Sequence, residues 1–251
     1  MGIIAAGATD IGRVRKTNQD SICLLNDVHF YAVADGMGGH QGGDIASQLS
    51  VKLMPEFIHG HPDMDPKALV NDCIVFINKS ILAHAQKNPE LEGMGTTITS
   101  IYFFGGQLFA GNVGDSRVYL IQKNSIFQLT RDHSFVQEKI NMGVSSREEA
   151  ALDKQKNVLV RSVGFEEILI VDVFSYRVAK NDLFLLCSDG LHGKVSDKDI
   201  LQIVNTHIPH PEKATKTDIE KAVSELIQLA NANGGQDNIS VIIALAQANE
   251  E

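Results

Sequence analysis

The stretch from Phe30 to Gly43 constrains the fold more than any other part of the chain. It begins with an apolar run, Phe30–Ala34, of the length expected for a buried strand. Asp35 follows, and then come five glycines within eight residues, which allow the backbone to approach a ligand or another segment closely. Apolar residues at helical spacing from Ile45 to Phe57 predict that a helix comes next. The stretch therefore predicts a strand, a tight loop that carries one carboxylate, and a helix.

Length and composition are those of a folded soluble protein. The chain has 251 residues, of which 43% are hydrophobic and 21% are charged, so it can bury one large core. We expect a single domain over residues 1–251. No apolar run approaches the roughly 20 residues of a membrane span, and the amino terminus lacks the pattern of a signal peptide. We therefore expect a cytoplasmic protein that does not enter the membrane, and we expect it to be a monomer.

Charge and cysteine content argue against two kinds of site. A net charge of −9 disfavours general nucleic-acid binding, which depends on neutralising phosphates with Lys and Arg. Cys23, Cys73 and Cys187 are widely spaced and lie among apolar residues. This placement indicates buried, reduced thiols rather than disulfides or a zinc site.

Predicted helices lie in the middle and at the end of the chain, with strands between them. Short strands joined by tight turns indicate antiparallel sheets, and the strand–helix alternation of a parallel sheet is absent. The sequence therefore predicts an α+β protein in which helices cover antiparallel sheets. The predicted strands are residues 21–25, 30–34, 96–104, 107–112, 116–122, 125–129, 168–178, 182–187 and 239–246. Later helices are predicted from Asp65-Pro66 to Asn88, from Ser196 with Asp199, and from Thr217 with Glu220 to Gly234.

The segment from Phe135 to Val163 has the weakest core pattern in the chain. Ser134 and Gln137 have the spacing of a capping box before a short helix that Gly143 would end. Two interpretations remain open. The segment is either a surface flap beside the functional site that influences the choice of substrate, or an ordinary helical connection.

Five aspartates share one setting, at the end or the start of an apolar strand and near glycine or asparagine: Asp20, Asp35, Asp115, Asp189 and Asp237. Carboxylates that converge in one cleft repel one another, so they are stable in ionised form only with cations between them. Oxygen ligands without Cys or paired His favour Mg²⁺ or Mn²⁺ over Zn²⁺. The alternative is five unrelated turn residues, since Asp-Gly after a strand is a common hairpin turn.

A pair of divalent ions in such a cleft would make the protein a phosphoester hydrolase. Two ions about 3.5 to 4 Å apart can activate a water molecule and hold the oxygens of an in-line displacement at phosphorus. Arg15 is suited to bind phosphate, because a guanidinium binds two oxygens at once. His40 lies near Asp35 in the sequence and could protonate a leaving alkoxide. For both residues, a solvated loop position is the alternative.

Seven motifs follow one another along most of the chain. They are RKTNQD at residues 15–20, VADGMGGH at 33–40, GTT at 95–97, GNVGDSR at 111–117, DHS at 132–134, LCSDGL at 186–191 and GQDN at 235–238. Together they resemble the metal-dependent protein phosphatases of the protein phosphatase 2C family, in a compact bacterial-type form. The resemblance extends from about Gly7 to Ala246 and is far more specific than any single Asp-Gly pair.

The resemblance implies a four-layer αββα sandwich, two antiparallel sheets flanked by helices, with metal ions in the cleft between the sheet edges. It implies that Asp35 bridges two ions, that Asp189 and Asp237 complete one site, and that the Gly36 carbonyl serves the other. Asp115, together with Asp189, would hold a third, weaker ion.

The same resemblance assigns two residues to the substrate. Arg15 would bind the phosphate, and His40 would assist the departure of the serine or threonine oxygen. Residues 135–163 correspond to the variable flap of the family. One departure concerns the metals: Gln19 stands where many relatives have Glu, so direct binding of an ion by Asp20 and binding through water both remain open. Gln236 replaces a frequent arginine, with no expected chemical consequence.

The leading functional hypothesis is a cytosolic phosphatase that acts on phosphoserine and phosphothreonine in proteins and opposes a serine/threonine kinase of the same cell. A catalytically silent module that binds phosphoproteins is the first alternative, and the presence of Asp35, Asp189 and Asp237 argues against it. A metal-dependent nuclease is the second, and the acidic net charge disfavours it.

Overall fold

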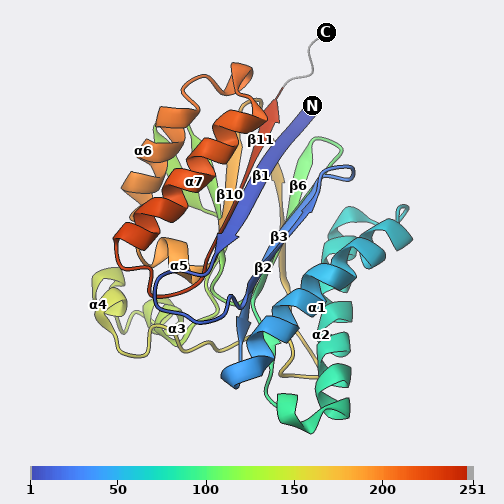
Figure 1. Ribbon diagram of the computed structural model, residues 1–251. Coiled ribbons are helices and arrows are strands. Elements are labelled where there is room, and N and C mark those ends of the chain that lie inside the picture. The colour runs from blue at the N-terminus through green and yellow to red at the C-terminus, as the bar shows by residue number, and fades with distance from the viewer. Residues whose placement is uncertain (1, 248–251) are drawn as a thin grey trace.

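Two antiparallel sheets pack face to face, and helices cover the outer face of each sheet (Figure 1). The computed structural model describes residues 2–247, apart from the side chains of residues 39–41, 147, 148 and 151. Three apolar clusters fill the spaces between the layers, one under each pair of long helices and one between the sheets. The predicted α+β sandwich of four layers is confirmed.

One sheet has six strands, five in the order β2-β3-β5-β6-β9 and one, β4, that pairs with β3. The predicted strand over residues 96–104 is interrupted at Thr97, whose backbone N–H donates to the carbonyl of Asp35 at 2.8 Å. The strands are β2 (Asp20–Leu25), β3 (Phe30–Met37), β4 (Gly95–Thr96), β5 (Ile98–Phe104), β6 (Gln107–Val113) and β9 (Asp172–Arg177).

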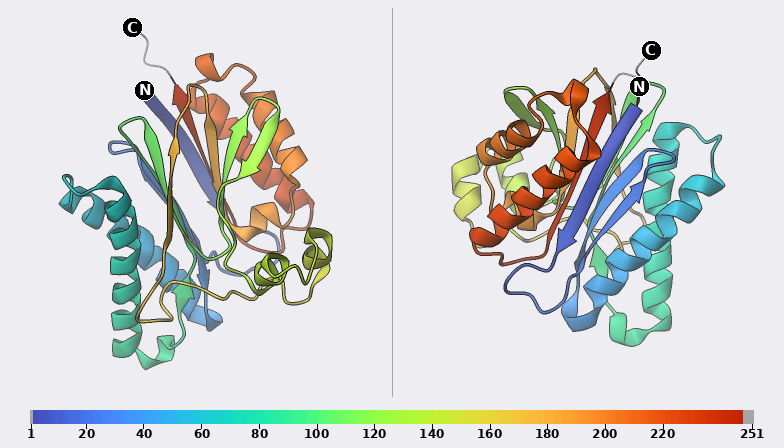
Figure 2. Two further views of the ribbon diagram at one scale, coloured as in Figure 1. Left: turned by 180° about the vertical axis from the view of Figure 1, so that it is seen from behind. Right: turned by 45° about the horizontal axis from the view of Figure 1, so that its top comes forward.

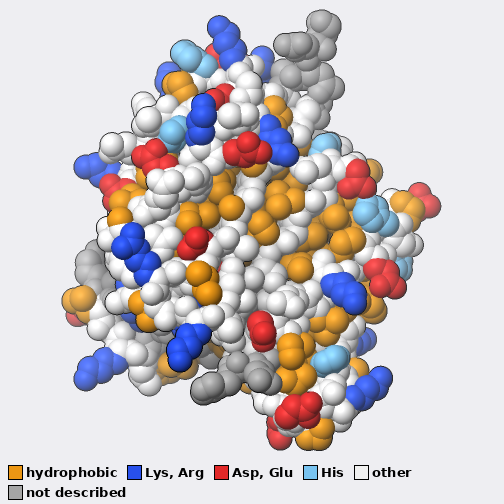
Figure 3. Space-filling model, in the orientation of Figure 1, with side chains coloured by type: hydrophobic (Ala, Val, Ile, Leu, Met, Phe, Trp, Pro, Cys, Tyr) orange, Lys and Arg blue, Asp and Glu red, His pale blue; other side chains and the backbone are white. Residues whose placement is uncertain are grey.

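The other sheet has five strands in the order β1-β11-β10-β7-β8. Its strands are β1 (Gly2–Asp10), β7 (Arg117–Gln122), β8 (Ser125–Gln128), β10 (Leu183–Cys187) and β11 (Ile239–Gln247). β1 and β2 are edge strands that lie side by side on one face of the molecule. In Figure 3, hydrophobic side chains gather at the centre of this face, and Ile3, Ile22 and Leu24 are partly buried apolar residues of these two strands.

Two long helices cover each sheet, and three short helices lie together at one end of the sandwich (Figures 1 and 2). α1 (Gly39–Gly60) and α2 (Pro66–Lys87) pack on the six-stranded sheet. α6 (Asp197–His207) and α7 (Lys216–Ala232) pack on the five-stranded sheet. The short helices are α3 (Phe135–Asn141), α4 (Arg147–Leu152) and α5 (Asp189–His192), and two 3₁₀ turns cover Pro89–Leu91 and Pro211–Lys213.

The alternation of side chains along β11 shows how one strand serves two layers. Ile242 and Ala244 belong to the cluster between the sheets, whereas Ile243 and Leu245 belong to the cluster under α6 and α7. Successive side chains of a strand point to opposite faces, so a continuous apolar run is needed where both faces are buried. This burial explains why residues 239–246 are apolar almost without interruption.

Several predictions about the elements are wrong. β1 was not among the predicted strands, and β3 continues to Met37, so Asp35 and Gly36 belong to the strand rather than to the predicted loop. α7 is capped by Thr215 with Asp218 rather than by Thr217 with Glu220, because the extended Thr215 accepts from the Asp218 backbone and Thr217 falls within the first turn. α1 begins at Gly39, six residues before the first apolar position of the predicted helix, because the glycine-rich segment is itself helical. β9 begins at Asp172, where its pairing with β6 starts, so residues 168–171 are not part of the strand.

α2 is the one helix within residues 2–247 that is long and apolar enough to cross a membrane by length and composition. Its apolar residues have partners in the fold: Ile74 and Ile77 are buried in the cluster beneath the six-stranded sheet. The Cα of Gly111 on β6 allows Val70 and Ile74 to approach closely, since a Cβ there would come within 2.6 Å of Val70. Packing on the sheet therefore accounts for the apolar composition of α2.

Replacing Phe184 with alanine should destabilise the sandwich strongly. The ring is fully buried between the sheets and lies edge-on to Phe103 and Tyr176. Phe184→Ala should lower the free energy of unfolding by about 3–5 kcal/mol, because it leaves a cavity that the rigid sheets cannot close. Phe127→Ala is the matched control, since the Phe127 side chain is 50% exposed, and it should cost less than about 1 kcal/mol. Chemical denaturation measures both values, and equal losses would contradict the packing described here.

Candidate metal centre and phosphate site

The five predicted aspartates come from five chain segments that meet at one end of the sandwich. Asp20 begins β2 and lies opposite Asp35 on β3 in the strand register. Asp189 follows β10 directly after Ser188, and Asp237 precedes β11. Asp115 lies in the turn between β6 and β7. Because neighbouring strands run in opposite directions, one strand ends and the next begins at the same end of the sheet.

A cavity of about 300 Å³ opens at this end of the two sheets. It brings together six of the predicted site residues, with Asp20 buried behind its lining. His40 lies in the first turn of α1, but its side chain is outside the part of the structure that is described. The lining residues are Arg15, Gln19, Asp35, Gly36, Met37, Gly38, Thr97, Asp115, Asn157, Leu159, Asp189 and Asp237.

Burial and mutual repulsion disfavour the ionised forms of these carboxylates. Burial raises the pKa of Asp35 well above its ordinary value, and the charges of Asp20 and three other site aspartates raise it further. Burial, with the charge of Asp189, raises the pKa of Asp115 to about 8. Burial, with the charge of Asp237, raises the pKa of Asp189 to about 6. A cation among these groups would favour their ionised forms.

Asp20 gives a second reason to expect a cation at this site. The residue is 5% exposed, and one carboxylate oxygen, Oδ2, accepts a hydrogen bond from Ser188 Oγ at 2.7 Å. The other oxygen, Oδ1, is buried without a hydrogen-bond partner. Burial is the main reason that the pKa of Asp20 is raised, to about 7. A buried oxygen of this kind fits an ion, or a water molecule bound to an ion, better than it fits an apolar wall.

The side chains do not by themselves enclose an ion. Among the described residues, no group of three or more His, Cys, Asp and Glu side chains is arranged to hold one metal. Mg²⁺ usually keeps several waters and is bound by one or two carboxylates, so the donor set fits a hard divalent ion that retains water. The residues present therefore fit Mg²⁺ or Mn²⁺, with water and backbone oxygens completing the coordination.

Close backbone packing fixes the end of β3, which carries Asp35, and the start of α5, which carries Asp189. A Cβ on Gly36 would lie 2.0 Å from the carbonyl oxygen of Gly43, and one on Gly190 would lie 1.9 Å from that of Asn238. No side chain fits at either position without moving the backbone. Thr97 Oγ1 also accepts from the backbone N–H of Asp35 at 3.1 Å.

Arg15 reaches the cavity from the loop between β1 and β2. Its Nη2 donates to Asp237 Oδ2 at 2.6 Å, and its side chain is 49% exposed. This contact with Asp237 raises the pKa of Arg15, and the charges of Asp189 and Asp35 also contribute. The structure thus places one exposed guanidinium against the acidic cluster, with donor groups accessible from solvent.

Asn238 anchors the loop that carries Arg15, a role that its motif alone did not reveal. Its Oδ1 accepts from the backbone N–H of Gln19 at 2.8 Å, and its Nδ2 donates to the carbonyls of Ile11 at 2.9 Å and Thr17 at 3.1 Å. The side chain is buried, so these three bonds have little competition from water. An asparagine directly before an apolar strand was the available signal, but it did not identify the partners.

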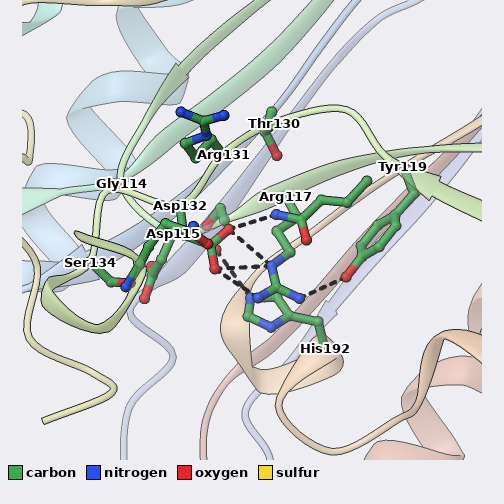
Figure 4. Close-up of polar contacts among 12 residues, drawn as sticks. Gly114, Asp115, Arg117, Tyr119, Thr130, Arg131, Asp132, Ser134 and His192 are labelled. Atoms are coloured by element: carbon green, nitrogen blue, oxygen red, sulfur yellow. Dashed lines mark hydrogen bonds and ion pairs between the residues drawn. The ribbon is translucent and has the colours of Figure 1, made fainter. Parts of the chain in front are cut away.

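The turn that carries Asp115 is held on several sides (Figure 4). His133 donates its backbone N–H to the carbonyl of Gly114 at 2.9 Å, and its Nδ1 accepts from the Gly114 N–H at 3.1 Å. His192 Nε2 lies 3.1 Å from the carbonyl oxygen of Asp115. Ser116 Oγ hydrogen bonds to Thr97 Oγ1 at 2.9 Å. Sequence reasoning assigned no role to His133 or His192.

The predicted flap borders the cavity. It contains α3 and α4, and its residues Asn157 and Leu159 line the cavity. It is tied to the rest of the fold by bridges between Ser134 and Leu159 and between Thr96 and Val163. Its position fits the interpretation as a flap beside the site, and its influence on substrate choice stays a prediction.

Comparison with known proteins places the chain in a family. A sequence profile described as Protein phosphatase 2C matches residues 12–238. The chain belongs to the protein phosphatase 2C family. It is 36% identical over 242 residues to the serine/threonine phosphatase stp of Listeria monocytogenes, covering 94% of this chain and 92% of that protein. It is also 36% identical over 240 residues to the serine/threonine protein phosphatase PstP of Mycobacterium tuberculosis, covering 95% of this chain and 44% of that protein.

Solved structures of serine/threonine phosphatases show the same architecture. The crystal structure of the M. tuberculosis phosphatase PstP/Ppp superposes with a TM-score of 0.89 at 34% identity, covering 99% of this chain and 100% of that chain. The catalytic domain of PstP in complex with two manganese ions superposes with a TM-score of 0.85 at 33% identity, covering 98% and 99%. The predictions of a bacterial-type member of this family and of a phosphatase are confirmed.

Replacing Asn238 with alanine should loosen the loop over residues 11–19. The variant loses three buried hydrogen bonds and leaves their backbone partners unpaired, so the free energy of unfolding should fall by about 1–3 kcal/mol. Amide hydrogen exchange of the loop should become faster. The control is Asn233→Ala, since the Asn233 side chain donates one bond, to the carbonyl of Lys194, at an exposed position. If both variants exchange and unfold alike, Asn238 is not the anchor described here.

Proposed function

We propose that this chain hydrolyses phosphoserine and phosphothreonine in proteins with the help of divalent ions, Mn²⁺ or Mg²⁺. The observation that carries the proposal is the gathering of carboxylates with raised pKa values around one cavity that also contains a guanidinium. The names of the phosphatases from Listeria and Mycobacterium support the substrate class. The two manganese ions of the PstP complex support the choice of metal.

The proposed ligand set divides between the two sheets. Asp35 would bridge two ions, with Asp189 and Asp237 at one and the carbonyl of Gly36 at the other. Asp115 would hold a third, weaker ion with Asp189. When bound, the ions lower the pKa of a water molecule and offset the charge of the phosphoryl oxygens. Asp20 lies behind the cavity lining, and this position favours contact with an ion through water.

Two basic side chains would act on the substrate directly. Arg15 presents a fork of N–H donors that matches two phosphate oxygens, and its loop is fixed by Asn238. His40 would donate a proton to the departing serine or threonine oxygen. The flap over residues 135–163 would contact the protein on which the phosphate is carried.

Further parts of the proposal concern the cellular setting. The substrates would be phosphoproteins modified by a serine/threonine kinase, and the enzyme would act in the cytoplasm as a monomer, without nucleic acid or membrane as partners. The net charge of −9 supports the exclusion of nucleic acid. The packing of α2 on the six-stranded sheet supports a position away from the membrane.

Replacing Asp189 with asparagine should abolish most turnover. The change removes one negative ligand from the proposed centre, so the rate of phosphate release with Mn²⁺ should fall more than about 100-fold. The assay uses p-nitrophenyl phosphate and a phosphothreonine peptide, with Asp63→Asn as the control because Asp63 is exposed between α1 and α2. Treatment of the unmodified protein with a chelator should have the same effect, and added Mn²⁺ should reverse it.

Other outcomes of this assay would support other functions. Binding of the phosphopeptide without turnover by the unmodified protein would indicate the silent binding module. Metal-dependent cleavage of DNA without release of phosphate from the peptide would indicate a nuclease. Either result overturns the phosphatase proposal for this chain.

Replacing Arg15 with alanine should lower kcat/KM for the phosphopeptide without removing the metal centre. Hydrogen bonds to a charged group contribute about 1.5–3 kcal/mol, which corresponds to a loss of about 10- to 100-fold in kcat/KM. Arg15→Lys should recover only part of this loss, because an ammonium cannot form the two-pronged contact. Steady-state kinetics with the phosphopeptide measures the effect. Lys16→Ala is the control, and an equal loss there would show that general positive charge matters rather than the guanidinium.

A further inference from the structure

We infer that His192 is a positioning residue, which fixes the Asp115 carboxylate relative to that of Asp189 by holding the carbonyl of Asp115. The inference rests on the proposed function, in which these two carboxylates share the third ion. Neither the motifs nor the family resemblance assigned His192 a role. The two ends of α5 are Asp189 and His192.

α5 is a single helical turn that joins the two positions rigidly. Asp189 is its first residue and His192 its last, and the backbone N–H of Gly193 closes the turn by donating to the Asp189 carbonyl at 2.8 Å. Gly190 packs against the carbonyl of Asn238 so closely that no Cβ fits. α5 therefore cannot shift without disturbing the segment that leads into β11, and Asp189 and His192 move together.

The bond from His192 connects this turn to the Asp115 segment, 77 residues away in the sequence. A carbonyl oxygen only accepts hydrogen bonds, so Nε2 of the imidazole must carry the hydrogen. The side chain lies beside the Arg117 guanidinium (Figure 4).

The surroundings of His192 restrict its movement. Arg117 is held by a two-pronged contact with Asp132, with Nη2 to Oδ2 at 2.7 Å and Nε to Oδ1 at 3.0 Å, and its Nη1 donates to the hydroxyl of Tyr119 at 2.9 Å. These contacts satisfy the charges of Arg117 and Asp132 within the cluster. His192 therefore lies beside an Arg117–Asp132 pair that is itself held by hydrogen bonds, and its Nε2–H donates to the Asp115 carbonyl.

The remaining bonds of the turn fix its other residues. His133 holds the backbone of Gly114, and Thr99 Oγ1 donates to the carbonyl of Ser116 at 2.9 Å, so the backbone is anchored on both sides of Asp115. The bond from His192 adds a direct connection to the helix that carries Asp189. An ion held between two carboxylates binds most tightly when their separation is already correct, and loss of an outer hydrogen bond that orients a ligand typically costs 10- to 100-fold in affinity for the metal.

Two substitutions of His192 distinguish the effect of losing the hydrogen bond from the effect of losing the imidazole ring. In His192→Gln the amide nitrogen occupies about the place of Nε2 and can reach the Asp115 carbonyl. In His192→Asn the amide nitrogen lies near the place of Nδ1 and falls short. Both variants are polar and smaller than histidine, so they differ chiefly in reach. His210→Asn is the control for a general effect of the substitution, since the His210 side chain is 72% exposed.

The experiment is a titration of the chelator-treated full chain with Mn²⁺ alone. Calorimetry measures the heat of binding, and electron paramagnetic resonance measures the concentration of the free ion. His192→Asn should raise the Kd of the weakest site about 10- to 100-fold and leave the tighter sites within about 2-fold, whereas His192→Gln should stay within about 3-fold of the unmodified protein. Thermal unfolding of each variant checks that the fold is intact. Equal affinities of the Gln and Asn variants would overturn the inference.

Asp115→Asn separates failure of this inference from failure of the proposed function. If Asp115→Asn leaves every Mn²⁺ site unchanged, the third ion of the proposed function is wrong and the inference fails with it. If Asp115→Asn removes the weakest site but His192→Asn does not weaken it, only the inference is overturned.

A measurement on the unmodified protein decides the question even if a variant of His192 fails to fold. The Nε2–H resonance of His192 in a ¹H–¹⁵N spectrum should shift as Mg²⁺ saturates the weakest site. The same addition to Asp115→Asn should leave the resonance in place. A resonance that does not respond in the unmodified protein would overturn the inference.

Discussion

The repulsion among acidic side chains at one end of the sandwich is the constraint on which the rest of the structure depends. Folding brings five aspartates to one place, and the pKa values of four of them are raised. Three apolar clusters, with two sheets between them, supply the free energy that holds this arrangement together. The core therefore lies along the length of the sheets, and the chemistry is confined to their ends.

α5 is where the parts of the site meet. It carries Asp189, it packs through Gly190 against the segment that bears Asp237, and it reaches the Asp115 turn through His192. Serine 188, just before it, holds Asp20 from the opposite sheet. A helix of four residues thus connects aspartates from both sheets. Because the helix is short and packed on several sides, these aspartates have little freedom to move independently.

Alternating or continuous apolar runs were sufficient to predict the strands other than β1, and the shared position of the five aspartates at strand ends was sufficient to predict that they meet. The four-layer sandwich was predicted from the resemblance of the motifs to a known family. The sequence was not sufficient to predict the residues that hold the site segments in place. Asn238 and His192 act on residues far away in the chain, and only the folded arrangement pairs them with their partners. The cap of α7 was placed at Thr217, two residues too late, because local spacing does not determine that Thr215 is the residue in the extended backbone conformation.

The place of β11 has a consequence for synthesis of the protein. This strand follows every other described element in the chain, yet it lies between β1 and β10 within its sheet. A nascent chain on the ribosome therefore holds β1 without its neighbour until residues 239–247 have emerged. The six-stranded sheet, whose strands all precede residue 178, can assemble earlier. The site should thus be completed late in synthesis, after β11 has paired with β1 and β10.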